Sequence, residues 1–215
     1  MGNLSSEKKY GRVAAIGRFK PLHLGGAAML ESMCESADQV LIGVGSCNKY
    51  NLRNPFTAQE SEEMIDSYLG PRFDNYSVLQ VPDFAQLDVE GAKDGSLWKN
   101  HVLKEFGTLD AFVSGNPYVA KLLGDEYEIV HPTTLIDPSK HIRLRAGMVR
   151  LAMAQGDERY ALMMPTEVHN YMIKNNLVER FCKEFGLATL VGLFTDANYS
   201  NTESAQEEWR HTLEV

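Results

Sequence analysis

The sequence predicts an α/β fold, in which a doubly wound parallel sheet of about five strands is followed by a C-terminal helical extension. Short apolar runs alternate with amphipathic stretches over the first 130 residues, and several of these runs end in Gly, which is typical of buried parallel strands. Alternation of this kind favours right-handed crossovers within one sheet. We therefore expect a Rossmann-like domain over residues 1–190 and a polar tail over residues 191–215.

The expected strands, in chain order, are RVAAIG (12–17), QVLIGVG (39–45), YSVLQVP (76–82), DAFVSG (110–115) and EYEIVHP (126–132). Between the first two, GGAAMLESMCESA has helical spacing. TAQESEEMIDSYLG is the next helix, in which Thr57 and Glu60 form a capping-box pair. Further helices are expected near 97–106 and 116–123. Ligands of such sheets bind beyond the carboxyl ends of the strands, so the loops that follow the strands are the expected site.

The pattern changes after residue 140. HIRLRAGMVRLAMAQG (141–156) is typical of one helix, and PTEVHNYMIKNNLVERFCKEFG (165–186) of two short helices, the last closed by Gly186. The apolar run LATLVGLF (187–194) is the next strand candidate.

Composition and charge argue against several classes of function. The chain has 215 residues and a net charge of −8, which disfavours a general nucleic-acid binder. It has no apolar run of membrane-spanning length and no secretory signal at its start, so we expect a cytoplasmic protein with no membrane partner. Its three cysteines lack CxxC spacing, which argues against a zinc site, and we expect no metal bound by side chains.

Basic residues gather in three short segments, each of which follows an expected strand. The segments contain Arg18, Lys20 and His23; Lys49 and Arg53; and Lys140, His141, Arg143, Arg145 and Arg150. Their meeting at one edge of the sheet would create a local anion site on an acidic chain. Solvated surface charge explains the spacing equally well, so the spacing alone does not decide between the two.

The first segment lies in GRFKPLHLGG (17–26), a loop between a strand and a helix. Gly25 and Gly26 open the helix, where backbone N–H groups and the helix dipole favour a phosphate. Pro21 stiffens the loop. His23 adds a side-chain donor that can be cationic beside an anion. The loop therefore indicates phosphate binding, although a tight turn with a surface His has the same outline.

The loop resembles the G-R-F-x-P-x-H-x-G-H signature of the nucleotidylyltransferase superfamily, and its form is similar to the archaeal-type nicotinamide mononucleotide adenylyltransferases. Further matches follow in order: IGVGS with NPFTAQE, SLW at 96–98, VSGNPYV, and HIRLR where the family has I-S-x-T-x-I-R. The similarity covers roughly residues 12–185. Several motifs in the right order are far more specific than one loop.

The resemblance implies attack of a nucleotide 5′-phosphate on the α-phosphorus of ATP, with Mg²⁺ accompanying the triphosphate. Nicotinamide mononucleotide is the implied acceptor, giving NAD and pyrophosphate, and a homo-oligomer is expected. The implied catalytic residues are His23 and Arg143, the nucleotide-binding residues are Gly17, Arg18, Phe19, Lys20, Gly25, Gly26, Arg53, Lys140 and Arg145, and the acceptor-binding residues are Trp98 and Asn116. Without the resemblance, Trp98 is a core residue and Asn116 equally well closes a turn.

The chain departs from the family pattern in three places. Gly26 stands where the second His belongs, and Ser61 where an Arg follows the Glu. If Ile142 and Arg143 set the register, Pro138 and Lys140 replace the Ser and Thr of the last motif. Either Arg53, Lys140 and Arg145 compensate, or the chain is a catalytically weakened nucleotide-binding pseudoenzyme. A third alternative is AMP or CMP transfer, from ATP or CTP, to a different phosphorylated acceptor.

Overall fold

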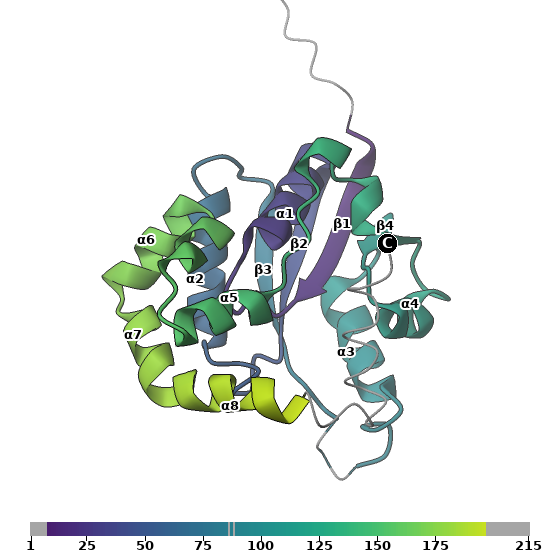
Figure 1. The fold of residues 1–215 in the computed structure, drawn as a ribbon. Coiled ribbons are helices and arrows are strands. Elements are labelled where there is room, and N and C mark those ends of the chain that lie inside the picture. The colour runs from purple at the N-terminus through teal and green to yellow at the C-terminus, as the bar shows by residue number, and fades with distance from the viewer. Residues whose placement is uncertain (1–7, 86, 88, 197–215) are drawn as a thin grey trace, which may run out of the picture.

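Five parallel strands form one sheet at the centre of the molecule (Figure 1). This computed structural model describes residues 8–85, 87 and 89–196. The strand order is β3-β2-β1-β4-β5. The strands are β1 (Tyr10–Gly17), β2 (Ala37–Gly45), β3 (Tyr76–Val81), β4 (Ala111–Val113) and β5 (Ile129–Val130). The predicted five-stranded parallel sheet is confirmed, although β4 and β5 are shorter than the apolar runs suggested.

The middle of the sheet is buried on both faces. Val13 of β1 lies opposite Val40 of β2 on one side and Ala111 of β4 on the other. None of these three residues exposes any surface to solvent. Strands buried in this way are expected to be continuously apolar rather than alternating, which is why their sequences identify them so clearly.

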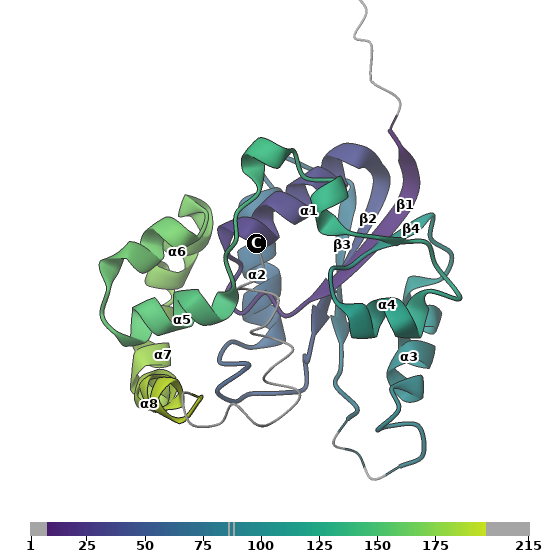
Figure 2. The ribbon, with the colours of Figure 1, turned by 45° about the vertical axis from the view of Figure 1, so that its right-hand side comes forward.

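Helices cover both faces. Helices α1 (Leu24–Ser36), which follows β1, and α2 (Ala58–Leu69), which follows β2, pack on one face of the sheet. Helices α3 (Ser96–Phe106) and α4 (Pro117–Leu123) pack on the other face (Figure 2). The direction of winding reverses between β1 and β4, which are neighbours in the sheet. This is the switch point at which ligands of open α/β sheets bind.

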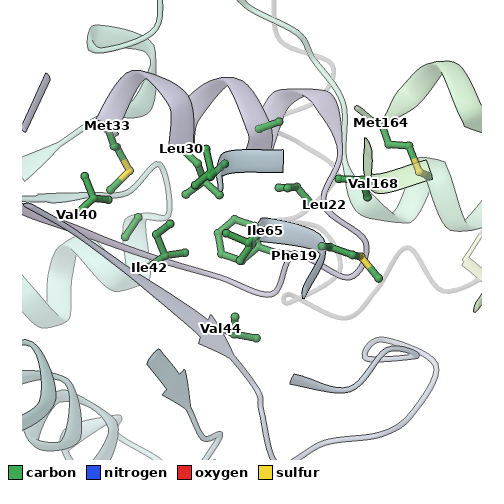
Figure 3. Close-up of a cluster of buried hydrophobic side chains, with 14 of the residues drawn as sticks. Phe19, Leu22, Leu30, Met33, Val40, Ile42, Val44, Ile65, Met164 and Val168 are labelled. Atoms are coloured by element: carbon green, nitrogen blue, oxygen red, sulfur yellow. The ribbon is translucent and has the colours of Figure 1, made fainter. Parts of the chain in front are cut away.

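The loop after β1 is anchored in the core by Phe19. Its ring is 9% exposed and lies beside Ile42 of β2 and Ile65 of α2 (Figure 3). Burial of a Phe side chain is worth roughly 1.5–3 kcal/mol. The backbone of Phe19 is left-handed, with φ of 50°. Phe19, which was expected among the nucleotide-binding residues, therefore shapes this loop from inside the core.

The C-terminal third is helical and packs against α1 and α2. Short 3₁₀ turns (132–134, 138–140 and 158–163) alternate with α5 (Ala146–Ala154), α6 (Thr166–Lys174) and α7 (Leu177–Phe181), and a π-helical turn (182–186) leads into α8 (Leu187–Asp196). The two short helices predicted over 165–186 are confirmed as α6 and α7. Figure 1 shows this group on the side of the sheet opposite α3 and α4.

Three predictions in this third were wrong. Residues 141–145 are not helical, and α5 begins only at Ala146. The run 187–194 is helical rather than a strand, and Gly186 does not end the preceding helix. Leu and Ala, which are strong helix formers, dominate that run, and it continues a helix without an intervening turn. A short apolar run cannot be assigned to helix or strand by periodicity alone.

The boundary expected between residues 190 and 191 falls inside α8, and residues 197–215 lie outside the described residues, so the division into a domain and a tail stays a prediction. Within the described part of the chain, no helix combines the length and the apolar character that crossing a bilayer requires.

Candidate functional site

The loop between β1 and α1 presents His23 at the start of a helix. His23 is the N-cap of α1, and its Nδ1 accepts a hydrogen bond of 3.3 Å from the N–H of Gly26. The first intrahelical bond runs from Ala27 N–H to the His23 carbonyl. The N–H groups of Leu24 and Gly25 thus have no acceptor within the helix, and they lie at its positive end. This arrangement suits an anion.

His23 is a neutral donor. Burial lowers its pKa to about 4, and the positive charge of Arg150 adds to the effect. Because Nδ1 accepts from Gly26, the ring hydrogen belongs on Nε2. The imidazole can therefore donate a hydrogen bond from Nε2 without carrying a charge.

Arg150 brings a cation to this loop from α5. Its Nη1 donates a 2.9 Å hydrogen bond to the carbonyl of Lys20, and its charge acts on His23. Sequence reasoning counted Arg150 in the third basic segment but not among the site residues. A partly buried guanidinium beside a helix N-terminus is suited to phosphate oxygens.

The position of Arg150 suggests a second register for the last family motif. LRAGMVR (144–150) matches I-S-x-T-x-I-R as well as HIRLR does, with conservative changes at its apolar positions. In that register Val149 is the apolar residue, and it is fully buried in the core cluster on α5. Arg145 and Gly147 then occupy the Ser and Thr positions. A search for the motif that allowed Val before the Arg would have found Arg150.

The segment before α5 lies against the start of α1. A Cβ added at Gly25 would stand 2.9 Å from the carbonyl oxygen of Ile142, so the two backbones approach closely. This close approach requires Gly25. Arg143 follows in the same extended stretch and is exposed, as are Lys140 in the preceding 3₁₀ turn and Arg145 at the N-cap of α5. The third basic segment thus reaches the first loop.

Lys20 has another environment. Its side chain is completely buried, and its Nζ donates a 3.0 Å hydrogen bond to the carbonyl of Ser46 in the loop after β2. Burial lowers its pKa to about 8; Cys47 opposes this effect and Arg18 reinforces it. Lys20 therefore links the first and second loops from within, whereas Arg18 remains partly exposed.

Arg53 lies exposed on a short turn after β2. The turn is closed by paired backbone bonds between Asn51 and Asn54, and the Asn51 side chain accepts the N–H of Arg53 at 3.1 Å. Thr57 and Glu60 then form the predicted capping box at the start of α2. Ser61, where the family has an Arg, is fully buried and donates to the Thr57 carbonyl.

The expected acceptor residues lie on the other side of the switch point. Trp98 is in the first turn of α3 and packs partly buried against the smaller core cluster. Asn116 is the N-cap of α4, and its Oδ1 accepts the N–H of Tyr118 at 2.9 Å. Both helices begin beyond the carboxyl ends of strands. The turn-closing role of Asn116 is thus observed.

Two glycines of the first loop have different surroundings. A Cβ at Gly17 would meet the ring of Phe19 at 2.7 Å, so no side chain fits there. For a Cβ added at Gly26, the nearest atoms are a Leu22 methyl at 3.3 Å, Cδ1 of Phe19 at 3.8 Å and Cε1 of His23 at 3.9 Å. A Cβ at position 26 needs only a small shift of Leu22 and would lie close to His23.

The donors around His23 are positively charged groups or N–H groups, which suit phosphate oxygens and not a metal ion. Across residues 8–85, 87 and 89–196, no three His, Cys, Asp or Glu side chains come together in a group that could hold a metal.

Comparisons with known proteins agree with this geometry. Residues 14–174 match the cytidylyltransferase-like family. The chain is 29% identical over 168 residues to a nicotinamide-nucleotide adenylyltransferase from Methanocorpusculum labreanum, covering 77% of this chain and 92% of that one. It is 30% identical over 166 residues to the enzyme of the same name from Methanoculleus marisnigri, with the same coverage.

A solved structure also shares the fold. It is a bifunctional NMN adenylyltransferase/ADP ribose pyrophosphatase from Francisella tularensis, complexed with AMP and a manganese ion, with a TM-score of 0.59 and 20% identity. The match covers 81% of this chain and 52% of that one, so this chain spans about half the length of the bifunctional protein. The family match covers most of the chain, and the chain belongs to the cytidylyltransferase-like family of nucleotidyltransferases.

Proposed function

We propose that this protein transfers AMP from ATP to nicotinamide mononucleotide, giving NAD and pyrophosphate. The observation that carries the proposal is that His23 caps the N-terminus of α1 while Arg150 binds the carbonyl of Lys20 in the same loop. Relatives that carry the name nicotinamide-nucleotide adenylyltransferase support the choice of acceptor.

In the proposed reaction an oxygen of the acceptor's 5′-phosphate forms a bond to the α-phosphorus of ATP. The bond from that phosphorus to the oxygen bridging to the β-phosphorus breaks, and pyrophosphate leaves with the electron pair. The reaction needs no covalent enzyme intermediate, so positioning and charge stabilisation supply the catalysis. Both are tasks for the cations and N–H groups of the first loop.

The residues divide this work by position. The Nε2–H of His23 and the N–H of Gly25 donate to phosphate oxygens near the reacting phosphorus, and Arg150 balances the charge that builds up there. A single well-aimed donor is typically worth about 3–4 kcal/mol in the transition state. We assign Arg18, Arg53 and Arg143 to the outer phosphates, with Lys140 and Arg145 beside them.

Arg150 also bears on the departures from the family pattern. With Gly26 in place of the second His, one donor is missing from the first loop. In the register LRAGMVR, Arg150 is the Arg of the last motif and is retained, and it contacts the same loop as His23. We therefore favour an active enzyme, possessing weakened rather than lost catalysis, over a pseudoenzyme.

Mg²⁺ is the ion we propose to accompany the triphosphate, where it would neutralise charge on the phosphate oxygens. No residue of this chain is assigned to it. On the acceptor side, Trp98 would offer its ring face to the cationic nicotinamide, and Asn116 would hold its amide close to the acceptor while capping α4. The cytoplasmic location and the homo-oligomer stay predictions.

The test is an assay of pyrophosphate release by the purified full-length chain. ATP and CTP are each combined with nicotinamide mononucleotide and with other phosphorylated acceptors, and the product is identified by chromatography. We expect NAD from ATP and nicotinamide mononucleotide, at a rate that His23→Ala lowers by about 100- to 1000-fold. Binding of ATP without turnover for every combination of triphosphate and acceptor would support the pseudoenzyme. A higher rate with another phosphorylated acceptor would identify that compound as the substrate instead.

A further inference from the structure

Arg180 contacts both ends of the loop that presents Arg53. This loop, residues 50–57, follows β2 and leads into α2. Arg180 comes from α7, more than a hundred residues later in the chain. In Figure 1, α7 lies at the lower left and follows α6, which packs against α2.

The contacts of Arg180 are directional. Its Nη1 lies 2.5 Å from Oε1 of Glu60 and its Nη2 2.7 Å from Oε2, a bidentate ion pair. Nη2 also lies 3.4 Å from the carbonyl oxygen of Pro55. At the other end of the loop, the guanidinium carbon is 5.9 Å from the centre of the Tyr50 ring. One side chain therefore ties both ends of the loop to α7.

Neighbouring residues reinforce these contacts. The ring of Phe181 packs against Phe56, with 6.1 Å between centroids, and Phe185 meets the Tyr50 ring edge to face at 5.3 Å. The Tyr50 hydroxyl donates to the carboxylate of Glu184. The loop thus contacts residues 180–185 at each end, Asn54–Phe56 are buried, and Arg53 lies on the exposed part of the loop.

The ion pair is too enclosed to be an ordinary surface pair. The Arg180 and Glu60 side chains are 30% and 16% exposed. Glu60 also accepts the backbone N–H of Thr57 through Oε2, the same oxygen that binds Nη2 of Arg180. Loss of Arg180 would thus disturb the carboxylate that completes the N-terminal cap of α2, where the loop ends.

We propose that Arg180 is a positioning residue, which holds the loop of residues 50–57 so that Arg53 meets the triphosphate. This inference rests on the proposed function. Arg180 does not touch the reacting atoms; it acts through Arg53. Its loss should raise the KM for ATP and leave kcat nearly unchanged, because Arg53 serves binding of the outer phosphates in both the ground state and the transition state.

The chain offers a matched control. Arg72 and Glu167 form a second Arg–Glu pair, 2.5 Å between Nη2 and Oε1, that joins the residues just after α2 to α6. It links the same two parts of the fold at the opposite end of α2. A helix of this length places the two pairs about 18 Å apart. Arg72→Gln therefore removes a similar pair without touching the loop.

The experiment compares Arg180→Gln, Arg180→Lys and Arg72→Gln in the full-length protein, with unfolding in urea to match their stabilities. We expect Arg180→Gln to raise the KM for ATP about tenfold, with kcat within about twofold. Arg180→Lys should recover part of the loss, and Arg72→Gln should leave the KM unchanged. Equal KM values for Arg180→Gln and Arg72→Gln would overturn the proposal.

A double-mutant cycle with Arg53→Ala tests whether Arg180 acts through Arg53. If Arg180 acts through Arg53, the double variant should be no worse than Arg53→Ala alone. Additive effects would overturn that route. If the wild-type chain shows no turnover, the proposed function fails, and hydrogen exchange then tests the positioning role by itself. Arg180→Gln should speed amide exchange at Arg53 and Asn54 but not in β1. Unchanged exchange at Arg53 and Asn54 would overturn the positioning role.

Discussion

The two sides of the switch point between β1 and β4 have diverged differently from the family pattern. On the side of α1 and α5, Gly26 and Ser61 replace expected cationic groups, and Lys20 is buried under the loop. On the side of α3 and α4, the Trp98 and Asn116 motifs match the pattern. This difference indicates an unaltered acceptor and a rearranged means of binding phosphate. In the register LRAGMVR, Arg150 matches the Arg of the last motif, so it is a cation that this half retains.

The largest effect is expected at Arg150, in the rearranged half. Arg150→Met should lower kcat by about 100-fold or more, because the transition state loses a cation beside His23. Arg143→Met, which tests the register HIRLR, should lower kcat less. Steady-state kinetics of both variants decide between the registers, and a larger loss at Arg143 would return the motif to HIRLR.

Trp98 tests the unaltered half. Trp98→Ala should raise the KM for nicotinamide mononucleotide about tenfold, since a cation over an indole face is worth roughly 1–2 kcal/mol. The KM for ATP should stay the same. Varying each substrate in turn measures both constants, with Trp98→Phe as the control that keeps an aromatic face. A change confined to ATP would contradict the division of the site into two halves.

Gly26 tests whether the rearrangement is complete. Gly26→His adds an imidazole whose Cβ would lie 3.9 Å from Cε1 of His23 and 3.3 Å from a Leu22 methyl. We expect kcat to rise by about tenfold or less, with little change in substrate KM, because Arg150 already supplies much of the charge. A rise of about 1000-fold would show that nothing had replaced the missing imidazole. Gly26→Ala controls for the helix propensity of the new residue.

The last effect concerns Lys20, and it is an effect on stability rather than on kinetics. Its pKa is lowered from the ordinary 10.5 to about 8, so between these values the unfolded chain binds a proton that the folded chain does not. The free energy of unfolding should therefore rise with pH across this window, by at most about 3 kcal/mol. Lys20→Met should lack this rise. Urea unfolding at pH 7 and pH 10 measures the difference between wild type and variant, and parallel curves would contradict it.

Local signals in the sequence predicted much of this site because they depend on neighbouring residues. The capping box of Thr57 and Glu60 and the helix opening at Gly25 involve groups at most a few positions apart. The burial of Lys20 could not be predicted in this way, because it depends on the carbonyl of Ser46 in another loop. The residues around a lysine in a basic segment do not indicate whether its side chain points into the core or into solvent.

Arg150 and the run at 187–194 show a second limit. Arg150 belongs to the site because α5 begins at Ala146, and the sequence places no strong N-cap residue there to mark that start. The run LATLVGLF is helical because it continues the turn before it. In both cases the deciding information is where a helix begins, which is the least certain feature of a pattern.

The two hydrophobic clusters allow the two halves of the site to change independently during evolution. His23 and Arg150 stand on elements packed into the larger cluster, and Trp98 and Asn116 on elements packed around the smaller one. The central sheet separates the two clusters. A substitution that repacks one cluster leaves the shape of the other almost untouched. The fold thus permits each half to drift independently, and a lineage can exchange its phosphate ligands while inheriting its choice of acceptor intact.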